Sequence, residues 1–188
     1  QLCKTLLFKI MRKVFVTGIG TDVGKTIVAA ILTEALQADY WKPIQCGSLE
    51  LTDTERVKRL VESKQSHFHT EAYLLRTPAS PHYAAEVEDK KIHWGRLKVP
   101  ETENTLVIEG AGGILVPFNY KGESMLDMAK NWDTEVVIVS RNYLGSINHT
   151  LLTLKVLADS GVKVLGIIFN GEENPSSEEV ILKATKVP

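Results

Sequence analysis

The stretch from Gly18 to Thr26 limits the possible folds of this chain more than any other. It reads Gly-Ile-Gly-Thr-Asp-Val-Gly-Lys-Thr, directly after the apolar run Val14-Phe15-Val16 and directly before a helical pattern at residues 27–38. A glycine-rich loop in this setting can turn its backbone N–H groups toward a phosphate, and the helix N-terminus adds partial positive charge. We therefore expect a phosphate-binding loop and the use of a nucleotide.

Two side chains at the end of this loop have predicted roles. Lys25 would reach the β- and γ-phosphates of a nucleotide, and Thr26 would offer its hydroxyl to Mg²⁺. The usual spacing places the first glycine five positions before Gly24, on Ile19 here, so Gly18 stands one residue early. A glycine-rich turn with an exposed lysine is therefore the alternative at this stage.

Short β-branched runs alternate with helical patterns along the chain. The runs are apolar nearly throughout, which is typical of strands that are buried on both faces. Strands separated by helices favour right-handed crossover units and a mainly parallel sheet. We predict an α/β fold, a P-loop NTPase-like and mainly parallel sheet with helices on both faces. The expected strands are 14–16, 105–108, 135–139 and 163–169, and the expected helices are 27–38, 54–63, 124–131 and 147–160.

The length of 188 residues, 44% of them hydrophobic, suits one domain with a sizeable core. Met11 stands immediately before the first expected strand. We therefore interpret residues 11–188 as a single domain and residues 1–10 as upstream or vector-derived sequence.

Charge and cysteine content indicate the setting in which the chain works. The net charge of −1 gives no broad attraction for nucleic acid or an anionic membrane. Cys3 and Cys46 do not make a disulfide framework, and free thiols suit a reducing compartment. We expect a cytoplasmic protein without nucleic-acid or membrane partners.

In a parallel sheet the ligand site lies beyond the carboxyl ends of the strands. Glu109 follows an apolar strand and precedes a glycine-rich turn, where an acidic residue can hold Mg²⁺; the alternative is the start of a surface turn. Asp53 could join it, although Thr52-Asp53 before a helix also has the pattern of an N-cap.

Two further strand ends could bind a second substrate. Lys42 follows a short strand, and it is either a solvated surface cation or the positive partner of that substrate. The turn Leu144–Asn148 opens a helix, so its N–H groups could bind a carboxylate. A plain capping turn, with Ser146 or Asn148 as the cap, is equally consistent with this pattern.

Five motifs in a fixed order resemble those of the dethiobiotin synthetases. They are Gly18–Thr26, Lys42-Pro43, Ala79–His82, Glu109–Gly113 and Leu144–His149, and the resemblance runs from residue 11 to about residue 170. It implies a homodimeric P-loop enzyme that converts 7,8-diaminononanoate, CO₂ and MgATP into dethiobiotin, ADP and phosphate. A carbamate and a carbamic–phosphoric anhydride are the implied intermediates.

The resemblance also implies roles for individual residues. Lys25 would contact the transferred phosphate, and Lys42 would hold the substrate carbamate, so both are expected to be catalytic. Thr26, Asp53 and Glu109 would surround Mg²⁺. The implied nucleotide site comprises Asp22, Val23, Gly24, Lys25, Thr26, Ile27, Asp53, Glu109, Gly110, Ala111, Gly112 and Asn170, the last of which would read adenine.

The implied substrate site draws on two subunits. Lys42 and Cys46 belong to one subunit, and many relatives carry a small hydroxyl residue in place of Cys46. The partner subunit would supply the turn that binds the substrate carboxylate, which places the active site near the subunit interface. This turn comprises Leu144, Gly145, Ser146, Ile147 and Asn148.

Three further expectations concern the end of the chain and the competing functions. Members of this family usually continue through another strand and a loop that touches adenine, so we expect the domain to lack these parts after Pro188. A P-loop switch ATPase is one alternative, although such proteins carry a second lysine where Gly20 stands here. A non-catalytic ATP-binding module is the other alternative.

Overall fold

A computed structural model describes residues 12–185 together with residues 187 and 188. The segment interpreted as an upstream extension, residues 1–10, lies outside the described residues. The expectation that the domain lacks a further strand and loop stays a prediction.

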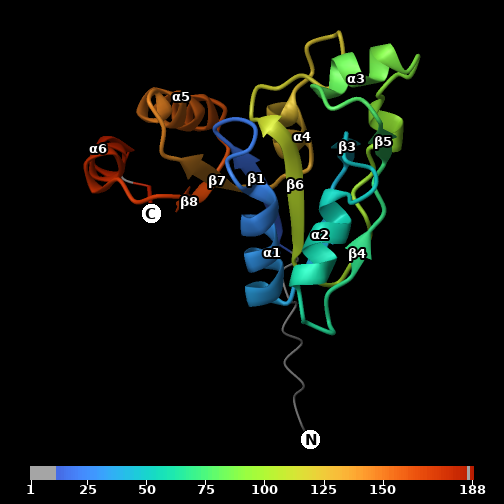
Figure 1. Cartoon of the computed structure of the whole chain (residues 1–188), viewed down its shortest axis with the longest axis horizontal. Helices are drawn as coiled ribbons and strands as arrows, with labels where there is room; N and C mark the ends of the chain where they lie inside the picture. Colours follow the sequence, from blue (N-terminus) through green and yellow to red (C-terminus); the bar gives the residue numbers. More distant parts are fainter. Residues whose placement is uncertain (1–11, 186) are drawn as a thin grey trace, which may run out of the picture.

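The described residues form a six-stranded parallel sheet in the order β4-β2-β6-β1-β7-β8 and a small two-stranded parallel sheet, β3-β5 (Figure 1). This architecture confirms the predicted α/β class. The strands are β1 Lys13–Gly18, β2 Asp39–Trp41, β3 Ile44–Cys46, β4 Phe68–His69, β5 Tyr73–Leu75, β6 Leu106–Gly113, β7 Glu135–Arg141 and β8 Val164–Asn170. The helices are α1 Lys25–Leu36, α2 Asp53–Leu60, α3 Pro81–Val87, the 3₁₀ turn η1 Trp94–Arg96, α4 Met125–Asn131, α5 Ser146–Asp159 and α6 Pro175–Thr185.

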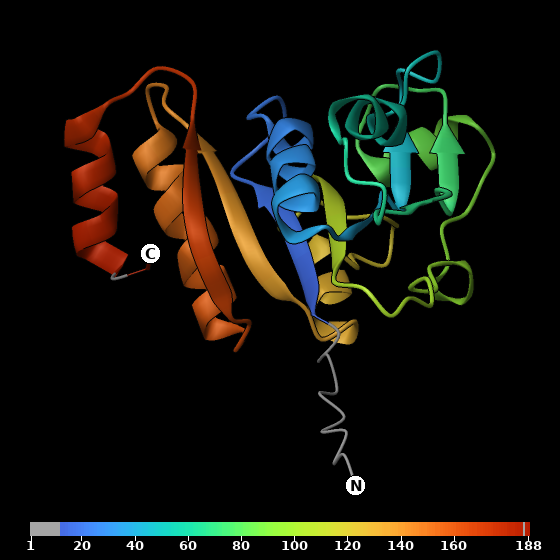
Figure 2. The same ribbon diagram turned by 90° about the horizontal axis from the view of Figure 1, so that it is seen from below.

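Helices cover both faces of the large sheet, as predicted. Helix α1 lies on one face, and α5 lies on the opposite face (Figure 2). Helix α2 packs beside α1, and α6 packs beside α5. The central strands β1, β6 and β7 are therefore shielded from water on both sides, which explains their apolar sequences.

Aromatic side chains fill the core beneath the site. The rings of Trp41 and Trp132 lie 5.2 Å apart between centroids, and Trp94 contacts Trp132 at 6.3 Å. Phe15 packs on the same cluster, 6.4 Å from Trp132. This close packing restricts the movement of the strands and of the residues at their ends.

Several elements differ from the sequence-based expectations. Strand β6 continues through the glycine run to Gly113, where a turn was expected at residue 110. Strand continuity here depends on the absence of a side chain, because a Cβ on Gly110 would lie 2.8 Å from the ring of Phe15. The small sheet and β4 were not predicted, because two- and three-residue strands show too little periodicity to be recognised. Helix α6 was not predicted either.

The strand register determines which residues meet at the carboxyl edge. Trp41 of β2 pairs with Ile108 of β6, so the next residues, Lys42 and Glu109, are neighbours. Val16 of β1 pairs with Glu109 on the other side of β6. The sheet therefore brings the loop after β1 and the end of β2 to the same carboxylate.

No helix within the described part of the chain combines the length and the apolar character that crossing a membrane requires.

Candidate active site

The loop between β1 and α1 is closed by a left-handed glycine. Gly24 has φ of 98°, which residues with a side chain rarely adopt. A Cβ at Gly24 would also lie 2.1 Å from the Asn170 amide nitrogen. The Lys25 ammonium donates a hydrogen bond to the Gly20 carbonyl at 2.9 Å, so its side chain lies over the loop that would cradle a phosphate.

A cavity of about 650 Å³ opens next to this loop. One wall is the phosphate loop, and the other combines β3 of the small sheet with the start of α3. The lining comprises Thr21, Asp22, Gly24, Lys25, Thr26, Lys42, Ile44, Gln45, Cys46, Ser48, Asp53, Pro78, Ala79, Ser80, Pro81, Glu109, Ala111, Gly112 and Val116. The structure thus brings both predicted catalytic lysines and all three predicted magnesium ligands to one cavity.

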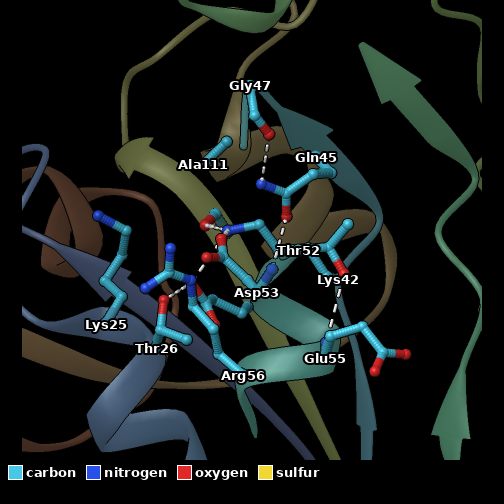
Figure 3. Close-up of polar contacts among 12 residues, drawn as sticks. Lys25, Thr26, Lys42, Gln45, Gly47, Thr52, Asp53, Glu55, Arg56 and Ala111 are labelled. Carbon is cyan, nitrogen blue, oxygen red and sulfur yellow. Dashed lines mark hydrogen bonds and ion pairs between the residues drawn. The ribbon is translucent and has the colours of Figure 1, made fainter. Parts of the chain in front are cut away.

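Lys42 is a buried cation rather than a solvated one. Its Nζ lies 2.9 Å from Asp53 Oδ2 (Figure 3). It also lies 3.0 Å from Glu109 Oε1 and 3.0 Å from the Gly110 carbonyl oxygen. An ammonium has three N–H donors, so these three oxygens use its full capacity. The interpretation of Lys42 as an ordinary surface charge is therefore wrong.

Glu109 is the centre of the site's polar contacts. Its Oε1 accepts hydrogen bonds from the Thr26 hydroxyl at 2.9 Å and from Lys42, and its Oε2 accepts one from the Tyr40 hydroxyl at 2.8 Å. The residue is almost completely buried. A buried carboxylate is tolerable only with such partners, which argues against the alternative of a surface turn.

Helix α2 presents Asp53 to the cavity because another residue caps the helix. The Thr52 hydroxyl accepts a hydrogen bond from the Glu55 N–H at 3.3 Å, so Thr52 is the N-cap. The N-cap pattern of Thr52-Asp53 is thus confirmed, with Thr52 rather than Asp53 as the cap. Gln45 secures this turn: its Oε1 accepts from the Asp53 N–H at 3.1 Å, and its Nε2 donates to the Gly47 carbonyl at 3.0 Å (Figure 3).

The charged side chains of the site shift one another's pKa values. Burial opposes the charge on Lys42, yet the Glu109 and Asp53 carboxylates raise its pKa above the usual value. Burial and the nearby Lys42 charge lower the pKa of Lys25 to about 8. Burial disfavours the Asp53 carboxylate, but Lys42 outweighs that effect and holds the pKa of Asp53 below its usual value.

The oxygen donors near Lys25 suit Mg²⁺. The Thr26 hydroxyl donates a hydrogen bond to Glu109 and is close enough to Asp53 to help lower the pKa of that carboxyl, so one hydroxyl and two carboxylates lie together beside the phosphate loop. Mg²⁺ in nucleotide sites takes one or two protein carboxylates and completes its shell with phosphate and water oxygens. Among the described residues, no cluster of three or more His, Cys, Asp or Glu side chains could hold a metal ion.

Cys46 lines the side of the cavity that β3 and α3 form. Burial raises the pKa of its thiol to about 11, so the side chain is a neutral thiol near pH 7. A neutral thiol can contact a ligand but does not act as a nucleophile.

Asn170 reaches the phosphate loop from the end of β8. Its Nδ2 donates to the Val23 carbonyl at 2.9 Å, which leaves its Oδ1 for another donor. Val23 is buried, Ile27 is half exposed on α1, and neither lines the large cavity. Gly110 and Asn170 also lie outside that lining, so their predicted contacts to the nucleotide remain predictions.

The turn at Leu144–Asn148 is not brought to this cavity within one chain. Gly145 is the N-cap of α5, with φ of 108°, so capping by Ser146 or Asn148 is wrong. Leu144 is fully exposed, and none of the five residues lines the cavity. Their predicted contact with a substrate stays a prediction that concerns a neighbouring subunit.

Two residues that hold the acidic side chains of the site in place were not found from the sequence. Tyr40 and Gln45 are both buried, and each holds one of the acidic residues in place. The signal for Tyr40 was its spacing: residues i and i+2 of a strand share a face, so Tyr40 and Lys42 point the same way. Gln45 had no comparable signal because β3 was not predicted.

Comparison with known proteins shows the family to which this chain is similar. Residues 12–188 match the family described as AAA domain. The ATP-dependent dethiobiotin synthetase BioD of Christiangramia forsetii is 54% identical over 92% of this chain and 83% of its own length. The protein of the same name from Cytophaga hutchinsonii is 51% identical over 93% of this chain and 84% of its own length.

A solved structure shares the fold at low sequence identity. It is the septum site-determining protein MinD of Pyrococcus horikoshii in complex with Mg-ADP, with a TM-score of 0.58. The match covers 95% of this chain and 79% of that chain, with 14% of residues identical. At this identity the likeness concerns the P-loop fold alone.

Proposed function

This chain belongs to the AAA domain family and to the ATP-dependent dethiobiotin synthetases within it, and we propose that its cavity converts 7,8-diaminononanoate, CO₂ and ATP into dethiobiotin, ADP and phosphate. The reaction is an ATP-dependent C–N ligation. One structural observation carries the proposal. The buried Lys42 lies between two carboxylates and next to the phosphate loop, so the cavity has a fixed cation for a second substrate.

The phosphate loop is the part of the cavity that would bind ATP. Backbone N–H groups before α1 would bind the phosphates of ATP, and Lys25 would leave the Gly20 carbonyl to contact the transferred phosphate. Asn170 would accept from the adenine amino group with its Oδ1 while its Nδ2 holds the loop at Val23. These residues align the γ-phosphate with the cavity.

Thr26, Asp53 and Glu109 would hold Mg²⁺. When it is bound, Mg²⁺ neutralises charge on the phosphate oxygens during phosphoryl transfer. The Thr26 hydroxyl and the Glu109 carboxylate already lie 2.9 Å apart, so this chain supplies their arrangement in advance.

The proposed role of Lys42 is to bind the second substrate during the reaction. One amine of the substrate captures CO₂ as a carbamate, and the carbamate oxygen attacks the γ-phosphate to give a carbamic–phosphoric anhydride and ADP. The second amine then attacks the carbonyl carbon, expels phosphate and closes the ring. Lys42 would pair with the carbamate after releasing one of its three oxygens, and Asp53 is the more exposed of its two carboxylate partners.

A second copy of the chain would complete the site. The exposed Leu144 and the N-terminus of α5 stand away from the cavity of their own chain, which supports a role across a dimer interface. Mixing a Lys42→Ala chain with a chain that carries Ser146→Pro should restore activity, because one of the two sites then has both intact parts. Absence of restored activity in a proven heterodimer would contradict the shared site.

We place this enzyme in the cytoplasm, with small molecules as its substrates and no nucleic-acid or membrane partner. The single experiment that tests the function measures ADP release with 7,8-diaminononanoate and bicarbonate, each omitted in turn. Release that requires both substrates, with dethiobiotin as the product, is the expected result. ADP release that needs neither substrate would refute the proposal.

A further inference from the structure

We propose that Tyr40 is a positioning residue whose hydroxyl fixes the Glu109 carboxylate, so that Oε1 faces Thr26 and Lys42. This inference rests on the proposed function, because it assigns Glu109 to the metal site of that reaction. It adds a residue that touches neither nucleotide nor substrate.

The backbone of β2 aims Tyr40 at Glu109. Tyr40 pairs with Val107 in the parallel register, and its side chain lies on the same face of β2 as Lys42. Tyr40 is completely buried, and its hydroxyl donates to Glu109 Oε2 at 2.8 Å. Tyr40 of β2 and Lys42, which directly follows β2, therefore reach the two oxygens of one carboxylate.

The two oxygens of Glu109 have different partners. Oε1 accepts from Thr26 and Lys42, and among the described residues the hydrogen-bond donor to Oε2 is Tyr40. The last torsion of a glutamate side chain is soft and broad, so the carboxylate plane is set by its hydrogen bonds. Without the tyrosine hydroxyl, the carboxylate plane could rotate and Oε1 would lose its fixed direction.

Tyr40 is itself held in place. Its ring packs on Phe68 of the edge strand β4, 6.4 Å between ring centroids. A tyrosine hydroxyl keeps its proton at neutral pH, so Tyr40 is a hydrogen-bond donor to the Glu109 carboxylate. The hydroxyl is thus a fixed donor of the kind that orients a metal-binding carboxylate without contacting the metal itself.

The test is the binding of Mn²⁺, used as a probe for the Mg²⁺ site, to the full chain in the presence of ADP. Free Mn²⁺ is measured by electron paramagnetic resonance for wild type and Tyr40→Phe. Phenylalanine keeps the ring packing and removes only the hydroxyl. We expect Mn²⁺ affinity to fall about tenfold, the lower end of losses for such partners, while ADP affinity without metal stays nearly unchanged.

Tyr73→Phe is the matched control. Tyr73 is also buried, and its hydroxyl accepts a hydrogen bond from the His93 N–H at 3.0 Å, in the small sheet. The control removes the same chemical group away from Glu109. It should leave Mn²⁺ affinity at the wild-type value even if its Tm falls as much as that of Tyr40→Phe.

A double-mutant cycle separates positioning from general stability. If the Tyr40 hydroxyl acts through the Glu109 carboxylate, Tyr40→Phe should have little further effect on Mn²⁺ affinity in a Glu109→Gln background. A Tyr40→Phe variant that binds Mn²⁺ as wild type does would overturn the proposal, as would an equal loss in both backgrounds. Because this readout needs no turnover, it is independent of whether ADP release requires 7,8-diaminononanoate.

Discussion

The Lys42 ammonium and the Glu109 carboxylate form an ion pair at 3.0 Å, with side chains only 5% and 1% exposed. The two residues are far apart in sequence, and the pairing of β2 with β6 makes them neighbours. Both charges are shielded from water, so removing one of them would leave the other buried without a compensating charge. The same pair therefore affects both activity and stability.

Lys42→Met should abolish dethiobiotin formation and also destabilise the fold. Removing one partner of a buried ion pair costs about 3–5 kcal/mol; here hydrogen bonds from Thr26 and Tyr40 remain on Glu109, so we expect about 3 kcal/mol. Urea unfolding and product assays measure the two effects. Lys155→Met, which removes an exposed pair with Asp159, should change neither. Wild-type turnover by Lys42→Met would contradict the role of Lys42.

Asn170→Ala should weaken ATP binding without slowing the chemical step. The change removes the hydrogen bond to the Val23 carbonyl and the implied contact to adenine, each worth about 1 kcal/mol. We expect KM for ATP to rise about tenfold or more, with kcat at saturating ATP nearly unchanged. Asn142→Ala is the control, because Asn142 bonds to Glu178 and to the Glu172 carbonyl instead. A KM for ATP that stays at the wild-type value would refute the adenine contact.

Cys46 should react slowly with iodoacetamide near neutral pH. Only the thiolate reacts, and burial raises the pKa of this thiol to about 11, so the rate should rise steadily with pH toward that value. Once alkylated, Cys46 should block 7,8-diaminononanoate-dependent ADP release while ADP binding persists, because it lies on the cavity wall opposite the phosphate loop. Peptide mapping identifies the modified cysteine, and Cys46→Ser should be protected. Fast alkylation of Cys46 at pH 7 would contradict the burial argument.

Asp39→Asn should remove a pH-dependent part of the stability. Burial disfavours the Asp39 carboxylate, but hydrogen bonds from Thr102, Asn104 and the His67 N–H, with a further contact to His69, lower its pKa from 3.8 to about 2. A lowered folded-state pKa stabilises the fold above pH 3.8, and that stabilisation is lost as pH falls toward 2.

The measurement is the difference in unfolding free energy between wild type and Asp39→Asn. We expect wild type to be more stable at pH 6 by about 2 kcal/mol, and the difference should shrink between pH 4 and pH 2. Asp159→Asn, at an exposed site on α5, should show a much smaller change over that range. A constant difference for Asp39→Asn would show that its pKa is not lowered.

Local sequence was enough to predict the elements that have a local cause. The phosphate loop is specified by glycines between a strand and a helix, and Gly24 indeed adopts a left-handed conformation. The long buried strands were recognised from their apolar runs. Helix α5 was predicted within one residue at each end. The small sheet was missed because its three-residue strands are fixed by partners rather than by periodicity.

The sequence by itself determined the α/β class, the phosphate loop and the residue types from which a nucleotide site can be built. Only the tertiary structure decided that Lys42 is buried rather than solvated, that Thr52 rather than Asp53 caps α2, and that Tyr40 holds Glu109. The physical reason is distance along the chain. Conformational preferences act over a few residues, whereas the Tyr40–Glu109 contact joins positions 69 residues apart and exists only once the sheet register is set.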